Sequence, residues 1–340
     1  MAITVKEIRD KKVWEEYILS RPEANFLHSW YWGEFYQNID HQIVRHGYYD
    51  DDKLVGVLLF IIENAKRGRH GIVPAGPIID WDNKSLVKFV FKDIRSIGKA
   101  KKCVFVRIRP QLLDNPESQQ LFKSNGLRPA PMHLHAELTW QTDLDESEDY
   151  ILQNTRKKTR YEIRQADKLG ITIKTTQDPS AIDRFYDIQL ETAKRHNFVP
   201  FSKKFLKEQF TLFAKNDLAT LYEAYHDGKL LAQAFIIFYG REAAYHYGTS
   251  TDAGRDLPGA YALQWQAIKD AKKRGIVRYN FWGVTKPEQT KHRFYGVSVF
   301  KRGFCGQEVA YLHAHDMVIN PSLYLVDLTI ETARKHIRHI

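Results

Sequence analysis

LYEAYHDGKLLAQAFIIFY occupies residues 221–239, and AAYHYGT follows over residues 243–249 after a glycine turn. Short runs rich in β-branched and aromatic residues, separated by turns centred on glycine, predict an antiparallel meander. From residue 259 to about residue 275, small and apolar residues recur at helical spacing, which predicts an amphipathic helix. Residues 277–284, VRYNFWGV, then predict another strand. The order predicted here is therefore meander, helix, strand.

A similar order appears upstream. Residues 48–62, YYDDDKLVGVLLFII, parallel residues 224–238, AYHDGKLLAQAFIIF, because in both a polar turn ending in Lys-Leu starts an apolar strand. A helix-like stretch over residues 84–101 then leads into CVFVRIR at residues 103–109. Such a repeat predicts two related halves. The element order is typical of the acetyltransferase-like (GNAT) fold. We therefore predict an α/β protein of two tandem GNAT-like domains, with mixed, mostly antiparallel sheets flanked by helices.

An acidic run, DLDESED at residues 143–149, suggests where the halves meet. A chain of 340 residues is longer than one core usually organises, so two domains are expected. We predict a first domain of residues 1–145 together with 316–340, and a second domain of residues 146–315. The last segment is predicted to be a helix that packs on the first half through one apolar face, formed by Leu323, Val326, Ile330, Ala333 and Ile337.

The charge balance indicates an acidic partner. Lys and Arg number 51 against 41 Asp and Glu, a net charge of +10, which favours nucleic acid or an anionic membrane face. No apolar run approaches the roughly 18 residues of a membrane span, and the N-terminus lacks the apolar run of a signal peptide, so a cytoplasmic location is expected. Cys103 and Cys305 are interpreted as buried structural thiols, and no metal site is predicted.

A strongly basic helix is predicted over residues 150–169. Arg156, Arg160 and Arg164 recur every fourth residue and form one ridge, which Lys157 widens. We predict that this ridge contacts nucleic acid, whereas the alternative is an ordinary solvated helix face.

Six aromatic residues crowd the stretch NFLHSWYWGEFY at residues 25–36. One interpretation is a core helix that Ser29 caps, since aromatic residues at helical spacing usually belong to a core. The other is one wall of a binding cleft. Farther on, residues 66–70, KRGRH, predict a basic hairpin tip, which is either solvated or in contact with phosphate.

Taken together, four motifs resemble the Fem-type aminoacyltransferases, the peptidyltransferases of peptidoglycan interpeptide bridges, over almost the whole chain. The motifs are TRKKTRYEIRQADKLG (residues 155–170), YHYG (245–248), YNFWG (279–283) and VFKRGF (299–304). The resemblance implies two tandem GNAT-like domains and transfer of an amino acid from aminoacyl-tRNA to an amine on the stem peptide of a peptidoglycan precursor. That precursor is either lipid II or a UDP-linked muropeptide. The resemblance implies no cofactor and allows peripheral contact with the inner face of the membrane.

The resemblance also implies roles for particular residues. Lys301, with Phe300 beside it, matches the catalytic position near the acceptor end of the tRNA. Strand alternation places the neighbours Tyr245 and His246 on opposite faces, so one of the two YHYG tyrosines could belong only to the core. Tyr245 and Tyr247 match the family's tyrosines on the cleft-lining strand, where they are expected to bind substrate. We also predict substrate binding by Trp32, Arg109, Lys204 and Trp282, and tRNA binding by Arg156, Lys157, Arg160 and Arg164. Without the resemblance, Lys301 would be interpreted as an exposed strand lysine.

Two departures from the family pattern concern the acceptor. The cations that grip the pyrophosphate in the small UDP-muropeptide-using members are missing from WYWGE at residues 30–34 and from the segment before Lys203 and Lys204. An acidic position at the end of a first-domain strand is occupied by Arg109. Lys203 or Lys204 is an alternative source of the missing charge. The departures predict that a UDP-linked precursor is a poorer acceptor than a lipid-linked or otherwise different one.

Two other functions compete with aminoacyl transfer. An acetyl-CoA-dependent N-acetyltransferase would need a basic, glycine-rich pyrophosphate loop before the second-domain helix, where the sequence has DLPGAY at residues 256–261. A binding module for tRNA or membrane, with a degenerate cleft, is the third possibility, and the FK pair at residues 300–301 argues against it.

Overall fold

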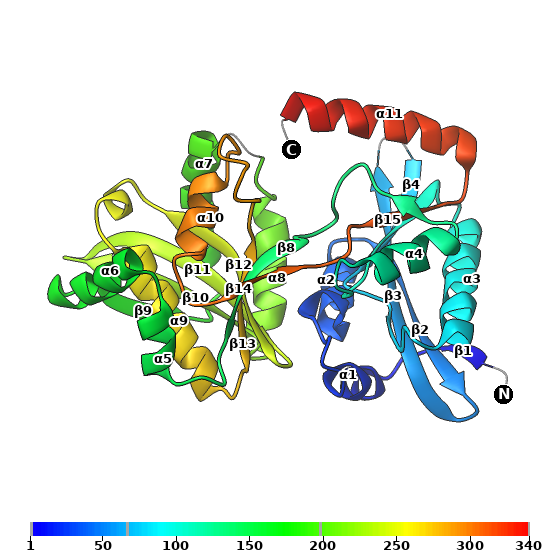
Figure 1. Cartoon of the computed structure of the whole chain (residues 1–340), viewed down its shortest axis with the longest axis horizontal. Helices are drawn as coiled ribbons and strands as arrows, with labels where there is room; N and C mark the ends of the chain where they lie inside the picture. Colours follow the sequence, from blue (N-terminus) through cyan, green and yellow to red (C-terminus); the bar gives the residue numbers. More distant parts are fainter. Residues whose placement is uncertain (1–2, 66–67, 197–198, 339–340) are drawn as a thin grey trace. The chain divides into compact units, whose positions relative to one another are not determined.

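Two units make up the chain in the computed structural model, which describes residues 3–65, 68–196 and 199–338 (Figure 1). Unit 1 comprises Met1–Glu137 and Ala310–Ile340, and unit 2 comprises Leu138–Val309. The chain therefore crosses between units just after residue 137, whereas the acidic run at residues 143–149 begins at the end of a strand of unit 2.

Unit 1 is built on a mixed sheet of eight strands. Its main path runs β1-β2-β3-β4-β6-β15-β7, and β5 pairs with β3. The strands are β1 (Ile3–Glu7), β2 (Gln42–Asp50), β3 (Lys53–Ala65), β4 (Gly68–Pro74), β5 (Ile78–Ile79), β6 (Phe105–Arg109), β7 (Arg128–Pro129) and β15 (His315–Val318). The helices are α1 (Lys11–Leu19), α2 (Trp30–Asn38), α3 (Lys84–Ala100), α4 (Pro116–Ser124) and α11 (Pro321–Arg338), with a 3-10 turn at Phe26–His28.

Unit 2 repeats that plan with seven strands in the order β14-β8-β13-β12-β11-β10-β9. The strands are β8 (Leu138–Asp143), β9 (Thr172–Thr176), β10 (Ala219–His226), β11 (Lys229–Tyr239), β12 (Glu242–Ser250), β13 (Arg278–Gly283) and β14 (Gln307–Ala310). The helices are α5 (Glu148–Asn154), α6 (Lys157–Lys168), α7 (Ala181–His196), α8 (Lys203–Lys215), α9 (Gly259–Lys273) and α10 (Tyr295–Lys301), with a 3-10 turn at Ala253–Arg255.

The repeated hairpin has the same register in both units. In unit 1, Tyr48 pairs with Gly56 and Tyr49 with Leu54, and in unit 2, Ala224 pairs with Ala232 and Tyr225 with Leu230, so each hairpin carries an irregularity at the same place. The turns place Asp51 and Asp227 in the left-handed region, at φ 51° and 47°, which Asp tolerates better than most residues. The sequence repeat therefore corresponds to a structural one.

Each unit also contains one parallel strand pair joined through a helix. In unit 1, β4 and β6 are parallel and α3 lies on the chain between them, and in unit 2, β12, α9 and β13 follow the same order. Apolar residues of α3 and α9 fill the two cores, as their predicted amphipathic spacing requires. The predicted mixed sheets flanked by helices are confirmed.

The basic helix differs from its prediction because it is broken in two. α5 ends at Asn154 and α6 begins at Lys157, so Arg156 precedes the helix and does not continue its ridge. Thr155 is extended and 2% exposed, and its hydroxyl accepts a hydrogen bond from Cys305 N at 3.1 Å. The break is therefore fixed by packing on the segment that follows α10, which periodicity cannot reveal.

Helix α11 packs through a face other than the predicted one. Leu323 and Val326 are 50% and 56% exposed, whereas Tyr324 and Asp327 are buried. Tyr324 packs on Phe105 of β6, and its hydroxyl donates to Asp316 of β15 at 2.9 Å. A buried polar contact thus selects the face, and the apolar stripe predicted to be core is exposed in its first two turns.

Within the described ranges, no helix is long and apolar enough to cross a membrane. Nor do the described side chains include a group of three or more His, Cys, Asp or Glu residues placed to hold a metal ion. Cys103 is buried, as predicted, while Cys305 is only partly buried. The predicted basic hairpin tip includes residues 66 and 67, which lie outside the described residues.

Candidate active site

The parallel strands β12 and β13 of unit 2 separate part-way along their length. Their pairing joins Glu242 through Ala244 to Arg278 through Asn280, although β12 runs on to Ser250 and β13 to Gly283. Beyond the last pair, backbone groups of both strands become available to other partners. The candidate site is built around this separation.

A β-bulge at His246 marks the same point on β12. Opposite β11, Phe235 pairs with Tyr247 and Ile236 with Tyr245, so His246 is the extra residue. Strict alternation would put Tyr245 and Tyr247 on one face, but Tyr245 packs against the core that includes α9, whereas Tyr247 packs on Phe235 and Phe201. The bulge therefore sends the two tyrosines to different surroundings.

Lys301 is the last residue of α10 and its side chain points back to the separated strands. Its ammonium donates to Gly283 O at 2.8 Å and stands 5.6 Å from the centre of the Tyr245 ring. The residue is 7% exposed, and burial lowers the pKa of its amine to about 7. The interpretation as an exposed strand lysine is wrong, because Lys301 is helical and buried.

Phe300 supports α10 from the core side. Its ring packs on Tyr261 of α9 at 5.0 Å and on Phe304 at 5.5 Å between centroids. In the middle of the helix, Ser298 Oγ accepts from Thr285 N at 2.9 Å, which ties α10 to the loop after β13. These contacts give Lys301 a fixed support.

Trp282 lies next to the carbonyl that Lys301 holds. It has a φ of +67°, a conformation that bulky residues rarely adopt. Its backbone N–H donates to Asn280 Oδ1 at 2.8 Å. Its ring is 5.4 Å from His246, edge to face. Strain at an aromatic residue beside a buried lysine is typical of a functional site.

The basic helix α6 begins close to the Lys301 turn. Arg156 N donates to Gly303 O at 2.8 Å, two residues beyond Lys301, and a Cβ added to Gly303 would lie 2.3 Å from Thr159 Oγ1. Arg160 donates to Thr155 O at 3.0 Å and also to Gln153 O, so it caps the end of α5. Basic side chains that remain exposed here are Arg156, Lys157, Lys158, Arg164 and Lys168, and Tyr161 is 60% exposed among them.

The other predicted residues belong to elements not described above: Trp32 and Arg109 to unit 1, and Lys204 to α8 of unit 2. Trp32 is 2% exposed and packs among Phe26, Phe35 and Tyr36, so it belongs to the core of unit 1, as the first interpretation of that aromatic helix predicts. Ser29 caps the helix, as predicted. Arg109 is 3% exposed and donates to Ala136 O at 2.6 Å in unit 1. Lys204 is exposed in the first turn of α8.

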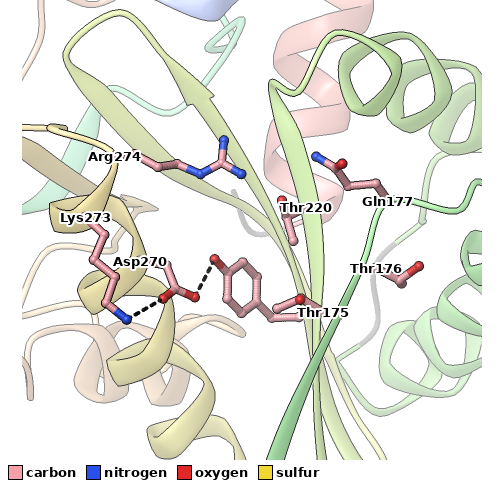
Figure 2. A pocket seen from close by; sticks show the side chains of 8 residues that line it. Thr175, Thr176, Gln177, Thr220, Asp270, Lys273 and Arg274 are labelled. Carbon is pink, nitrogen blue, oxygen red and sulfur yellow. Dashed lines mark hydrogen bonds and ion pairs between the residues drawn. The ribbon is translucent and has the colours of Figure 1, made fainter.

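Unit 2 also carries a polar hollow away from Lys301. The cavity measures about 460 Å³, and Figure 2 shows Lys273 beside Asp270, 3.7 Å apart, within it. Its lining residues are Thr175, Thr176, Gln177, Thr220, Tyr222, Asp270, Lys273 and Arg274. Tyr222 Oη donates to Asp270, and Arg274 binds Asp217 O at 3.0 Å, so these groups already have partners.

Sequence reasoning missed three contributors to the site: the Gly283 carbonyl, Asn280 and the His246 bulge. Every residue has a backbone carbonyl, so the sequence does not show which carbonyl accepts a hydrogen bond from Lys301. A bulge is visible only once two strands are paired. The one available signal was the NFWG run at residues 280–283, which was recognised as a motif but not as a site of backbone strain.

Two family models match the chain. The FemAB family model matches residues 10–126, and an acetyltransferase (GNAT) domain model matches residues 153–302. A lipid II:glycine glycyltransferase of Staphylococcus aureus (strain bovine RF122 / ET3-1) is 20% identical over 386 residues, covering 91% of this chain and 92% of the relative. The same enzyme from strain MRSA252 matches equally well.

Solved structures agree with the fold. The crystal structure of FemX superposes with a TM-score of 0.84 at 17% identity, covering 96% of this chain and 99% of that one. A tandem GNAT protein from the clavulanic acid biosynthesis pathway gives a TM-score of 0.59 at 10% identity, covering 94% and 99%. The predicted tandem GNAT-like architecture is confirmed.

Proposed function

We propose that this chain, as a member of the Fem-type family, is an aminoacyltransferase that takes part in forming peptidoglycan bridges. It moves an amino acid from aminoacyl-tRNA to an amine on the stem peptide of a peptidoglycan precursor. The observation that carries the proposal is Lys301, buried on Gly283 O where β12 and β13 separate. The related glycyltransferases, which are named for lipid II, support the same acceptor class here.

The reaction does not need a protein nucleophile, because an aminoacyl ester is already activated. The protein must align the acceptor amine with the ester carbonyl and assist the proton transfers. The acceptor amine attacks the ester carbonyl, a C–N bond forms, and the C–O bond to the tRNA ribose breaks. One proton leaves the amine and one arrives at the departing ribose oxygen. A lysine whose pKa lies near 7 can stabilise the negative charge as an ammonium and supply that proton.

The place of α6 supports a tRNA donor. Arg156, at the start of the exposed basic surface, is hydrogen-bonded through its backbone to Gly303, two residues after Lys301. A phosphate backbone bound along α6 would therefore approach the turn that carries the catalytic lysine. An exposed tyrosine among the cations adds a surface on which a base can stack.

The function is tested by incubating the purified protein with charged tRNAs and with both lipid-linked and UDP-linked muropeptides, and by following the mass of each precursor. We expect an added aminoacyl residue that depends on the charged tRNA. Acetyl-CoA is supplied in a parallel reaction and its binding measured by calorimetry. An acetyl mass increment together with acetyl-CoA binding would instead assign the protein as an N-acetyltransferase.

The acceptor is expected to be the lipid-linked precursor. The pyrophosphate-gripping cations of the UDP-muropeptide-using members have no counterparts at the matching positions of this chain. Turnover of the UDP-linked precursor should therefore be at least about tenfold slower at equal concentration, since one lost charge-assisted contact is worth about 1.5–3 kcal/mol. Efficient turnover of the UDP-linked form would show that the missing cations have been replaced elsewhere.

Charge reversal on α6 should weaken tRNA binding. Because Arg160 caps α5, we would leave it intact and change the exposed Arg156, Lys157 and Arg164 to Glu. Loss of three phosphate contacts should lower the slope of log K against log salt by about two to three. Lys84, Lys88 and Lys92, exposed at four-residue spacing on α3, provide the matched control, and reversing them should leave the slope nearly unchanged. Equal effects of the two triple variants would contradict a specific role for α6.

A further inference from the structure

Gln209 of α8 holds a buried oxygen that is not used within the fold. The residue is 0% exposed, and its Nε2 lies 3.0 Å from Nε2 of His246. Its Oε1 is buried and, among the described residues, has no hydrogen-bond partner. In this orientation of the amide, the nitrogen is engaged by His246 and the oxygen is left without a partner.

The surroundings of Gln209 Oε1 favour a ligand that donates a hydrogen bond. Burial lowers the pKa of His246 to about 3, so the imidazole is neutral. With the Gln209 amide in this orientation, Nε2 of the ring is the acceptor and the ring proton belongs on Nδ1. An unsatisfied buried acceptor costs about 1–3 kcal/mol, a cost that a bound N–H group would remove. Such leftover groups are uncommon in native proteins and invite a functional explanation.

A continuous set of contacts joins Gln209 to the Lys301 site. His246 is the extra residue of the β12 bulge, and its ring lies 5.4 Å from Trp282. The next residue, Gly283, provides the carbonyl that accepts from Lys301 at 2.8 Å. The oxygen of Gln209 therefore lies in the same part of unit 2 as Lys301 and the separated strands.

We propose that Gln209 Oε1 is a binding acceptor for the primary amine of a reactant, with His246 holding the amide in place. The inference rests on the proposed aminoacyl transfer, because both reactants of that reaction carry a primary amine. One is the α-ammonium of the aminoacyl ester and the other is the amine of the acceptor peptide. A neutral carbonyl oxygen suits either group, since it binds an ammonium without the desolvation cost of a second buried charge.

The test compares aminoacyl-tRNA with an acyl-tRNA that has the same side chain but no α-amine. Wild-type protein should prefer the aminoacyl donor by about 10- to 100-fold, the value of a hydrogen bond to a charged group. Gln209→Met keeps the size of the side chain and should reduce that preference to nearly one. Gln264→Met is the matched control, because Gln264 is a buried glutamine whose Oε1 already accepts from Tyr279 Oη at 2.7 Å. This control should retain the preference even if its melting temperature falls.

A second arm distinguishes the two sources of the amine. If the acceptor amine is bound, Gln209→Met should leave the donor preference unchanged and raise KM for the precursor about tenfold or more, while Gln264→Met does not. A folded Gln209→Met protein with wild-type donor preference and wild-type precursor KM would overturn the inference.

A third readout needs no turnover, so it separates this inference from the proposed function. Amino-acid methyl esters should raise the melting temperature of wild-type protein and of Gln264→Met more than the corresponding esters without an amine, and Gln209→Met should lose the difference. Loss of that difference in Gln209→Met would support the amine site even in a protein that transfers nothing to a muropeptide. Equal stabilisation of Gln209→Met by the amino esters would count against it.

Discussion

Lys301→Met is expected to lower the maximal rate of aminoacyl transfer by roughly 100-fold or more, as loss of one well-placed electrostatic group commonly does. Methionine preserves the length of the side chain but removes the ammonium that donates to Gly283 O. Lys301→Arg should not restore the rate, because a planar guanidinium has a different shape and does not release its proton near neutrality. Rates are measured at saturating aminoacyl-tRNA. A defect confined to KM would make Lys301 a docking residue.

The same substitution should stabilise the fold, which separates a catalytic defect from misfolding. Burial lowers the folded-state pKa of Lys301 to about 7 from an ordinary value of 10.5, so between these two pH values the unfolded chain binds more protons. Stability therefore rises as pH increases through this window, and the full cost of the buried charge is present below pH 7. Lys301→Met removes that cost and should gain on the order of 3 kcal/mol at pH 6. Denaturant unfolding at pH 6 and at pH 10 should show the gain shrinking with pH.

Local patterns predicted the parts of the fold that local forces determine. The two Lys-Leu hairpins were recognised because turn residues and the strands beside them are adjacent in sequence, and both hairpins have the same register. Helix α9 followed from apolar spacing. The bulge at His246 was not predicted, since it depends on how β12 pairs with a neighbouring strand.

Residues of the site were predicted from the sequence only where they belong to a recognised motif. Lys301 was identified through resemblance alone, and its burial, its bond to Gly283 O and its place at the end of a helix came from tertiary packing. Gln209 was never a candidate, because nothing in the sequence distinguishes a glutamine whose oxygen is left free from one that is satisfied. Arg160 illustrates the reverse case, since a side chain expected to face RNA caps the end of α5.

Helix α11 shows how a polar network can override an apolar pattern. Arg107 of β6 donates to Asp316 Oδ1 at 2.8 Å and to Glu331 of α11 at 2.8 Å, and Tyr324 donates to Asp316 Oδ2. Asp316 is 0% exposed, so its charge depends on hydrogen bonds such as those from Arg107 and Tyr324 and not on water. Satisfying this cluster orients α11 and leaves Leu323 in solvent.

Asp316→Ala is accordingly expected to destabilise the protein by about 3–5 kcal/mol, because it leaves the buried Arg107 without its bidentate partner and Tyr324 without an acceptor. Glu7→Ala is the control, since the Glu7–Arg9 pair is exposed and its loss should cost at most about 1 kcal/mol. Arg107→Met combined with Asp316→Ala should cost less than the sum of the two single changes, by at least about 1 kcal/mol, because neither charge is then left alone. Urea unfolding measures all four variants, and amide exchange in α11 reports whether the helix is released. Additive costs would mean that the pair contributes through packing and not through its charges.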